Sequence, residues 1–281
     1  MGIVGIIGAG TMGRGIAQVS AAAGYDVILN DVSMDLVASS VDRLSAGLDS
    51  LVNKGKMESV IRDELLSRVT KSADLRDMAN ADIVVEAIYE DLDAKKKLFT
   101  ALDEYCGEDV VLGSNSSSLS ILDMAMATKR PESVVGIHFF NPVPRMKGVE
   151  LVCTILTSFR TLETARQFSA SLGKETWVAK DAPGFLSTRL LIPYLLDAIR
   201  LLENGFAGKE DIDTCCVLSF NYPMGPLTLA DLIGLDVLLN ISNGMYESFR
   251  EPKFVAPILL EKMVKAGQLG RKTGKGFYDY E

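Results

Sequence analysis

The first half of the chain alternates short apolar runs with longer stretches in which apolar residues recur every three or four positions. The short runs predict strands and the longer stretches predict amphipathic helices. A repeated strand–helix–strand pattern is typical of a mostly parallel sheet covered by helices. The predicted strands are Gly2–Ile7, Asp26–Asp31, Ile83–Glu86, Val110–Gly113, Val134–His138, Lys147–Val152 and Glu175–Val178, and the predicted helices are Met12–Ala23, Met34–Lys54, Ala94–Glu104 and Ser158–Leu172.

The pattern changes at Asp181–Gly184, where a proline and a glycine interrupt the chain. Beyond this point only helical periodicity remains. We therefore predict an α/β domain with a mostly parallel sheet over residues 1–182 and a smaller all-helical domain over residues 183–281, which suits the length of 281 residues. The helices predicted in the second domain are Leu186–Leu202, Lys209–Leu218, Leu227–Phe249 and Val255–Ala266.

Composition narrows the classes of partner. The net charge of −8 argues against nucleic acid or an anionic membrane as the main partner. No apolar stretch reaches about 18 residues, and the first ten residues lack the basic region of a signal peptide. One histidine and four cysteines without metal-ligand spacing argue against a metal site. We expect reduced cysteines and a cytoplasmic location.

A glycine-rich turn follows the first predicted strand. Residues 8–13 read Gly-Ala-Gly-Thr-Met-Gly, a G-x-G-x-x-G motif that opens a predicted helix, and Asp31 ends the next strand. Gly8 permits the tight turn, Gly10 lets the backbone approach a pyrophosphate, and Gly13 lets the helix pack against the sheet. The first helical turn, with Thr11 and Met12, offers backbone N–H groups to phosphates. Asp31 accepts hydrogen bonds from a ribose and repels a 2′-phosphate, so this Rossmann-type pattern favours NAD over NADP.

The single histidine, His138, ends a predicted strand, where open α/β sheets place ligands. A turn-prone segment then leads to Glu150, which can fold back to hydrogen-bond the imidazole and orient a general acid/base. A satisfied core histidine and a solvated Glu150 are the alternatives. Ser114–Ser118 follow another strand, and their hydroxyls can line the same crevice or cap the helix expected over Ile121–Ala127.

With these motifs in order along the chain, the sequence resembles the L-3-hydroxyacyl-CoA dehydrogenase family, in particular its bacterial 3-hydroxybutyryl-CoA branch. The resemblance covers nearly the whole chain. The segments that carry it are Gly8–Gly13, Val85–Ala87, Ser114–Leu119, His138–Pro142, Pro183–Phe185, Tyr222–Pro226 and Gly270–Tyr278.

The resemblance implies hydride transfer between NAD(H) and C3 of a short-chain acyl-CoA, by a homodimer with its nicotinamide and thioester in a cleft between the domains. It implies that His138 is the general acid/base, that Glu150 orients it, and that Ser117 hydrogen-bonds the C3 oxygen. The positions that match cofactor contacts are Glu90, Lys95, Asn141 and Lys272, and the CoA phosphates would meet Lys54 with Lys56 nearby. A solvated helix end is the alternative for these two lysines.

One position departs from the family pattern. After Pro183-Gly184-Phe185, Thr188 stands where the family has a catalytic-site asparagine, so an amide is replaced by a shorter hydroxyl. Two other functions therefore stay open: a dehydrogenase of the same fold for a free 3-hydroxyacid or sugar acid, and an impaired NAD-binding relative.

Overall fold

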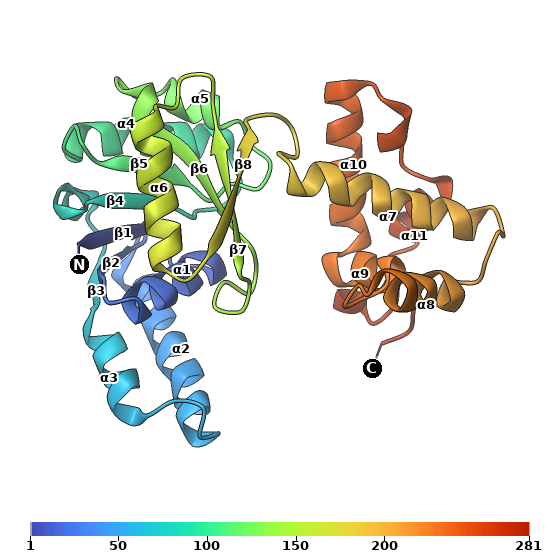
Figure 1. Ribbon diagram of the computed structural model, residues 1–281, viewed down its shortest axis with the longest axis horizontal. Helices are drawn as coiled ribbons and strands as arrows, with labels where there is room; N and C mark the ends of the chain where they lie inside the picture. Colours follow the sequence, from blue (N-terminus) through green and yellow to red (C-terminus); the bar gives the residue numbers. More distant parts are fainter. Residues whose placement is uncertain (1, 281) are drawn as a thin grey trace. The chain divides into compact units, whose positions relative to one another are not determined.

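The computed structural model describes residues 2–280, so the outer limits of the two predicted domains, residues 1 and 281, lie outside it. The chain divides into two compact units, one up to Ala182 and one from Pro183 onward (Figure 1). Within the described residues, no helix is long and apolar enough to cross a membrane. The predicted fold class, a Rossmann-type mostly parallel sheet with a second, smaller all-helical domain, is confirmed.

The first unit is built on one eight-stranded sheet. Its strand order is β3-β2-β1-β4-β5-β6-β7-β8, and every neighbouring pair is parallel except β6 and β7. The central strands are apolar and buried because helices cover both faces of a parallel sheet. The strands are β1 Ile3–Ile7, β2 Asp26–Asn30, β3 Val69–Ser72, β4 Ile83–Glu86, β5 Val111–Ser114, β6 Val134–Phe139, β7 Gly148–Cys153 and β8 Glu175–Lys180.

Helices pack on this sheet through apolar stripes. Helix α6 lies across β5 to β8, and α1 packs on β1 and β2 (Figure 1). Four helix starts carry a side-chain cap: Ser33, Asp91, Ser120 and Ser158 each accept a hydrogen bond from a backbone N–H in the first turn. The helices are α1 Thr11–Ala22, α2 Met34–Asn53, α3 Ser59–Ser67, α4 Leu92–Tyr105, α5 Ile121–Ala125 and α6 Phe159–Ser171, with short 3₁₀ turns at Leu75–Asn80 and Pro131–Ser133.

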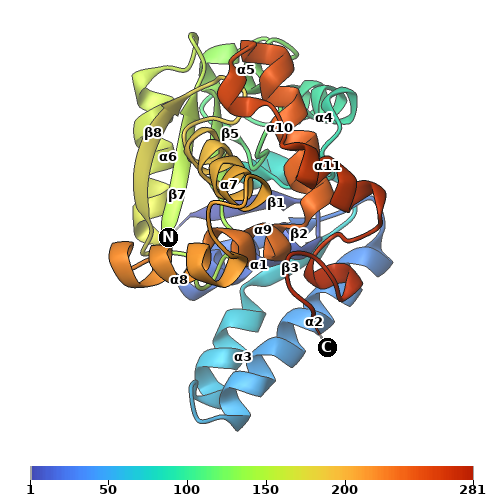
Figure 2. The same cartoon turned by 90° about the vertical axis from the view of Figure 1, so that its right-hand side faces the viewer.

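Two elements of this unit are absent from the sequence-based prediction. Helix α3 buries only Leu65, and β3 is an edge strand with two exposed residues among four. Such short, half-solvated elements carry little hydrophobic periodicity. Figures 1 and 2 both show α2 and α3 as a pair of helices that extends away from the sheet.

The second unit is all-helical and has its own apolar core. Its buried side chains include Leu195, Leu227, Leu238 and Phe254. The helices are α7 Ser187–Glu203, α8 Lys209–Phe220, α9 Pro226–Ile233, α10 Leu235–Phe249 and α11 Ile258–Lys265, with 3₁₀ turns at Pro252–Phe254 and Arg271–Thr273.

Two predicted helices in this unit are corrected by the structure. The stretch Leu227–Phe249 is not one helix: Gly234, with φ of +103°, separates α9 from α10. The helix predicted over Val255–Ala266 begins only at Ile258, because Pro257 takes an extended conformation as its N-cap. Apolar periodicity continues across both breaks, so it does not reveal them.

The C-terminal segment is held on α9 by a buried carboxylate. Asp231 accepts hydrogen bonds from the backbone N–H groups of Phe277 and Tyr278 and from the hydroxyl of Tyr280. A Cβ at Gly270 would lie 2.3 Å from the Asp231 carbonyl oxygen, so the close approach requires glycine. The family-like segment Gly270–Tyr278 therefore has a structural role within this unit.

Candidate active site

The carboxyl ends of the central strands meet at one edge of the sheet. Ile7, Glu86 and Ser114 end β1, β4 and β5 and are neighbours in the strand register. The chain reverses its direction of strand addition at β1, between β2 and β4. Ligands of open α/β sheets bind outside the carboxyl ends at such a switch point. This edge is the candidate site.

The glycine-rich turn lies at this edge between β1 and α1. Gly8 has φ of +100°, and a Cβ there would lie 2.5 Å from the Ala87 carbonyl oxygen. A Cβ on Gly13 would lie 1.8 Å from the Gly8 carbonyl oxygen, so only glycine allows this approach of helix to turn. A Cβ on Gly10 would have nothing within 4 Å. Gly8 and Gly13 are thus required by the fold, whereas Gly10 leaves its space open beside the uncapped start of α1.

A cavity of about 810 Å³ opens next to this turn. Its lining includes Gly8, Gly10 and Asp31 and is otherwise mostly apolar, with side chains such as Leu36 and Leu98. Asp31 is held in place because its carboxylate accepts hydrogen bonds from the backbone N–H groups of Ala9 (2.7 Å) and Val32 (2.7 Å). Apolar walls suit an adenine, the Asp31 carboxylate suits ribose hydroxyls, and the open helix start suits a pyrophosphate. The residues present therefore fit NAD.

A row of three side chains crosses β6, β7 and β8. His138 is paired with Glu150, and Glu150 with Trp177, in adjacent strands, so all three point to one face of the sheet. His138 Nδ1 lies 3.0 Å from Glu150 Oε2, and Trp177 Nε1 donates to Glu150 Oε1 at 3.2 Å. Glu150 is fully buried and His138 is 7% exposed. The Glu150 carboxylate thus orients the His138 ring, and Trp177 orients the carboxylate.

Aromatic packing and one amide fix the end of β6. The ring of Phe140 stacks on Trp177 with centroids 5.7 Å apart and lies 4.6 Å from the His138 ring centroid. Asn115 Oδ1 accepts the backbone N–H of Phe139 at 2.9 Å. The serine-rich loop after β5 is therefore tied directly to the strand end that carries His138.

A cluster of three charged residues lies between the end of β4 and the start of α4. Lys95 Nζ lies 2.7 Å from Glu86 Oε1 and 2.8 Å from Glu90 Oε2, and only 1% of the Lys95 side chain is exposed. Burial raises the pKa of Glu86, because it outweighs Lys95 and the hydroxyl of Ser114. Burial also opposes ionisation of Glu90, but Lys95, Ser116 and the Ser117 N–H together lower the Glu90 pKa. The ammonium thus keeps Glu90 ionised at the loop.

Glu90 organises the loop that carries Ser117. Its Oε1 accepts hydrogen bonds from Ser116 Oγ (2.7 Å), from the Ser117 backbone N–H (2.9 Å) and from Ser117 Oγ (3.3 Å). Ser116 Oγ in turn accepts the N–H of Leu119, and Ser120 caps α5. The helix cap predicted for Ser114–Ser118 is wrong in position, because Ser120, two residues beyond that segment, caps α5. The lining role stays a prediction, for which Ser117 is the candidate.

The structure places the remaining predicted residues of the first unit as follows. Asn141 follows β6 and is exposed. Lys54 is the C-cap of α2 and Lys56 lies in the turn before α3; both side chains are exposed. Since α2 spans 20 residues, or about 30 Å, these lysines lie far along the helical pair from Asp31.

Two predicted residues belong to the helical unit. Thr188 lies in the first turn of α7 and is half-buried. Lys272 forms an ion pair with Asp236 of α10, with Nζ and Oδ1 2.5 Å apart. The hydrogen bond from Lys272 lowers the pKa of Asp236.

Three contributors to the site have no role in the sequence-based assignment. Trp177 positions Glu150, Glu86 anchors Lys95, and Ser116 holds Glu90. Glu86 gave a usable signal, because a carboxylate that ends an apolar strand needs a buried partner. Trp177 and Ser116 gave none, since their partners lie on other strands or loops.

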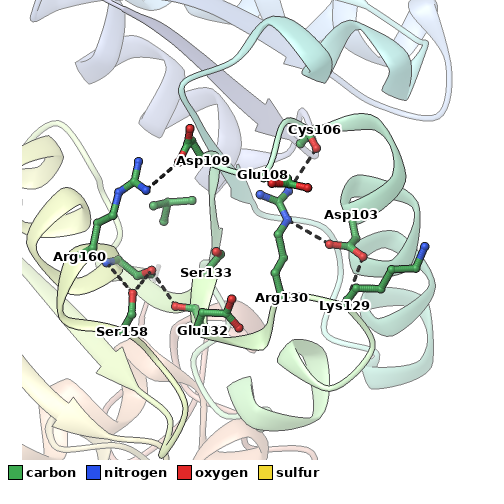
Figure 3. A pocket seen from close by; sticks show the side chains of 12 residues that line it. Asp103, Cys106, Glu108, Asp109, Lys129, Arg130, Glu132, Ser133, Ser158 and Arg160 are labelled. Atoms are coloured by element: carbon green, nitrogen blue, oxygen red, sulfur yellow. Dashed lines mark hydrogen bonds and ion pairs between the residues drawn. The ribbon is translucent and has the colours of Figure 1, made fainter.

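A second cavity, which is polar and has a volume of about 570 Å³, lies at the amino edge of the same sheet (Figure 3). Arg130 pairs there with Asp103 at 3.0 Å and donates to the backbone carbonyls of Gly107 and Val110. Arg160 pairs with Asp109 at 2.6 Å. Among residues 2–280, no group of three or more histidine, cysteine or acidic side chains is arranged to hold a metal ion.

Known proteins share both units of this chain. The family model described as the NAD-binding domain of 3-hydroxyacyl-CoA dehydrogenase matches residues 3–182, and the model of that family's C-terminal domain matches residues 184–280. The chain is 46% identical to a 3-hydroxybutyryl-CoA dehydrogenase of Clostridioides difficile over 98% of each chain. It is 44% identical to the human mitochondrial hydroxyacyl-coenzyme A dehydrogenase, over 99% of this chain and 91% of that protein. The crystal structure of the (S)-3-hydroxybutyryl-CoA dehydrogenase of Ralstonia eutropha superposes with a TM-score of 0.96 at 42% identity, over 99% of each chain.

Proposed function

Because the chain belongs to the 3-hydroxyacyl-CoA dehydrogenase family, an NAD-dependent family of oxidoreductases, we propose that it interconverts acetoacetyl-CoA and (S)-3-hydroxybutyryl-CoA. The preference for a short acyl chain is supported by the activities for which its relatives from Clostridioides difficile and Ralstonia eutropha are named. The observation that carries the proposal is the 3.0 Å contact between His138 and Glu150 at the carboxyl edge of the sheet.

Bound NAD(H) supplies or accepts the hydride at C3 of the acyl group. The protein's part is the proton. In the reducing direction, His138 in its imidazolium form donates a proton to the C3 oxygen from Nε2. Glu150 accepts a hydrogen bond from Nδ1 in both protonation states, so the ring keeps one orientation throughout. Trp177 keeps Glu150 in place through its other oxygen.

Ser117 contributes a hydrogen bond to the C3 oxygen as negative charge develops there. Glu90 holds the Ser117 backbone, and Lys95 holds Glu90. We therefore assign Lys95 a positioning role in the charged cluster as well as the cofactor-side location predicted for it. The pyrophosphate would be held by the turn between β1 and α1, at Gly8, Gly10, Thr11, Met12 and Gly13.

The remaining contacts of the proposal lie further from the glycine turn. Asp31 would hold the adenosine ribose, and Asn141 and Lys272 the cofactor's other end. Lys54 and Lys56 would meet the CoA phosphates; both are exposed cations at the tip of the α2–α3 pair. Charge favours this assignment, because CoA is a polyanion.

The decisive experiment removes the proton carrier and keeps its volume. His138→Gln should lower kcat for acetoacetyl-CoA reduction by about 10³-fold, the usual range for loss of a general acid. NADH absorbance gives the rate, and calorimetry gives NADH binding, which should change less than about twofold because Asp31 and the glycine turn are intact. A variant with full activity would remove His138 from the mechanism.

Two other functions make different predictions. A dehydrogenase for a free 3-hydroxyacid or sugar acid would reduce acetoacetate as well as acetoacetyl-CoA, and Lys54→Glu with Lys56→Glu would leave its KM unchanged. An impaired NAD-binding relative would bind NADH and turn over neither. We expect reduction of the CoA ester only, with a KM raised by the two charge reversals.

We also propose a homodimer in the cytoplasm. The helical unit exposes large apolar side chains, including Leu190, Phe206 and Leu218, which favours burial against a second copy. All four cysteines are free thiols, as expected in a reducing compartment. Sedimentation equilibrium at micromolar concentration should give twice the chain mass.

A further inference from the structure

A cavity of about 470 Å³ lies at the C-terminal end of α1. Three segments line it: the last turn of α1, the connection from β6 to β7, and the turn between α6 and β8. Because α1 spans 12 residues, or about 18 Å, this cavity and the glycine turn lie at opposite ends of the helix. None of its described lining residues belongs to the cavity beside Asp31 or to the lysines predicted for CoA.

The charged side chains of this lining are all cationic. Arg145, Lys147 and Lys174 line the cavity, and among its described lining residues none is acidic. Within residues 2–280, none of the three cations has a carboxylate close enough for an ion pair, whereas Arg160 and Arg166 of the neighbouring α6 each have one. The C-terminal end of α1 opposes these three positive charges with only about half a negative charge.

Lys174 is built into the wall of the cavity. It is 8% exposed, and its Nζ donates to the carbonyl oxygens of Val143 and Met146, at 2.7 Å each. An ammonium group has three N–H donors, so one remains for a ligand. Burial lowers the pKa of Lys174, as expected for an ammonium group whose partners are neutral. A bound anion would compensate this buried charge.

We propose that this cavity binds a phosphate monoester with a small apolar group, at a site separate from those for NAD(H) and CoA. At pH 7 such a phosphate carries a charge of about −1.5 to −2, which suits three cations partly offset by a helix end. Arg145 and Lys147 donate charge-assisted hydrogen bonds to the phosphate oxygens, and the third donor of Lys174 completes the set. The half-buried side chains of Val19 and Leu172 offer apolar surface to the ester group.

Calorimetry with the full-length chain tests the proposal with two probes, phenyl phosphate and inorganic phosphate, each with and without saturating NADH. Phenyl phosphate should bind with a Kd below about 1 mM, and NADH should not change it, because the glycine turn lies at the other end of α1. Inorganic phosphate should bind about tenfold more weakly, since it lacks the group that contacts the apolar wall. Arg145→Ala and Lys147→Ala should each weaken phenyl phosphate about three- to tenfold. Both side chains are exposed, so these variants should fold as wild type does.

The matched control is Lys54→Ala combined with Lys56→Ala, which removes two exposed cations at the tip of the α2–α3 pair. It should leave the Kd of both probes unchanged. Competition by NADH would place the probe at the glycine turn, and weaker binding in the control would place it at the CoA lysines; either result overturns the proposal.

The proposal is also overturned if phenyl phosphate binds wild type with a Kd above about 1 mM, or if Arg145→Ala and Lys147→Ala bind it as wild type does. Equal Kd values for the two probes would identify free phosphate as the occupant and overturn the assignment of an ester. Failure to bind NADH would instead contradict the proposed function, and the titrations without NADH would still decide on this cavity.

Discussion

Two polar cavities lie at opposite edges of one sheet, and their arginines differ in whether they are paired with a carboxylate. At the amino edge, Arg130 is buried, pairs with Asp103 and donates to three backbone carbonyls, those of Cys106, Gly107 and Val110 (Figure 3). At the carboxyl edge, Arg14 and Arg43 line a cavity in which neither pairs with a carboxylate of residues 2–280. Both cavities are polar, but only the second holds an unsatisfied buried hydroxyl, that of Ser40.

The contrast distinguishes an arginine that stabilises the fold, Arg130, from two arginines that remain available to a ligand, Arg14 and Arg43. Arg130 supplies the donors that the carbonyls before β5 need, and these bonds satisfy the guanidinium in return. Pairing of this kind leaves no reason to infer a ligand in the larger cavity. The carboxyl edge instead has donors without acceptors, which is the arrangement that favours an anion.

The largest expected effect is the loss of stability when the hydrogen bonds of Arg130 at the amino edge are removed. Arg130→Met should lower the free energy of unfolding by about 3–5 kcal/mol, because it leaves Asp103 and the carbonyls of Gly107 and Val110 buried without their partner. Urea unfolding followed by fluorescence of Trp177, the only tryptophan, gives the value.

The control for that change is Arg160→Met. Its ion pair with Asp109 is exposed on both sides, at 73% and 82%, so the loss should be less than about 0.5 kcal/mol. The dissociation constant for NADH should be unchanged in both variants while they are folded. A large change in NADH binding with little loss of stability would contradict the division between the two edges.

The second test disrupts cofactor binding at the carboxyl edge without changing the stability of the fold. Gly10→Ala adds a Cβ with nothing within 4 Å, so the melting temperature should stay within about 2 °C of wild type. The dissociation constant for NADH should rise at least a hundredfold, because the methyl group occupies the space through which a pyrophosphate approaches the backbone. Differential scanning fluorimetry and calorimetry measure the two quantities on one sample.

Gly13→Ala is the matched comparison. Its Cβ would collide with the Gly8 carbonyl, so it should lose stability and NADH binding together. Equal binding by wild type and Gly10→Ala would mean that the dinucleotide does not use this turn.

The third test asks whether the helical unit takes part in the chemistry. Thr188→Asn introduces, in the first turn of α7, the amide that the resemblance predicts at this position, and we expect kcat to rise about tenfold. Thr188→Val, which keeps the shape and removes the hydroxyl, should lower kcat. If both variants match wild type, position 188 has no part in the reaction.

How much of this the sequence foretold depends on the range of the interactions. The β1–α1 turn was predictable because strand, glycines and helix are consecutive. The contact between His138 and Glu150 was one of the alternatives that the sequence offered, because a turn-prone connection between Phe139 and Gly148 joins their antiparallel strands. Gly234 was not recognised as a break, since a glycine within apolar periodicity is tolerated in many helices.

The parts that escaped prediction depend on side chains brought together by the whole sheet. Glu86 and Lys95 are nine residues apart, yet their burial and the shared contact with Glu90 follow from packing, not from spacing. Arg14 and Arg43 lie on different helices and meet only because α1 and α2 flank the end of β2. The pattern of residues along the chain does not encode contacts of this kind between separate elements.

The smallest effect lies inside the carboxyl edge, where two carboxylates share Lys95 with opposite consequences. The pKa of Glu90 is lowered, so its ionised form stabilises the fold above about pH 4.5, and this contribution is lost as pH falls through the lower folded pKa. The pKa of Glu86 is raised, so its contribution is present in full below about pH 4.5 and is lost as pH rises through the higher folded pKa.

Urea unfolding between pH 4 and pH 8 distinguishes these two opposite pH dependences of stability. Relative to wild type, Glu90→Gln should lose less than about 1 kcal/mol near neutral pH and less still towards pH 4, since 38% of the side chain is exposed. Relative to wild type, Glu86→Gln should instead gain stability as pH rises. If the stability difference from wild type changes with pH in the same direction for both variants, Lys95 does not affect the two carboxylates in opposite ways. The charges at the carboxyl edge would then be as fully paired as those at the amino edge.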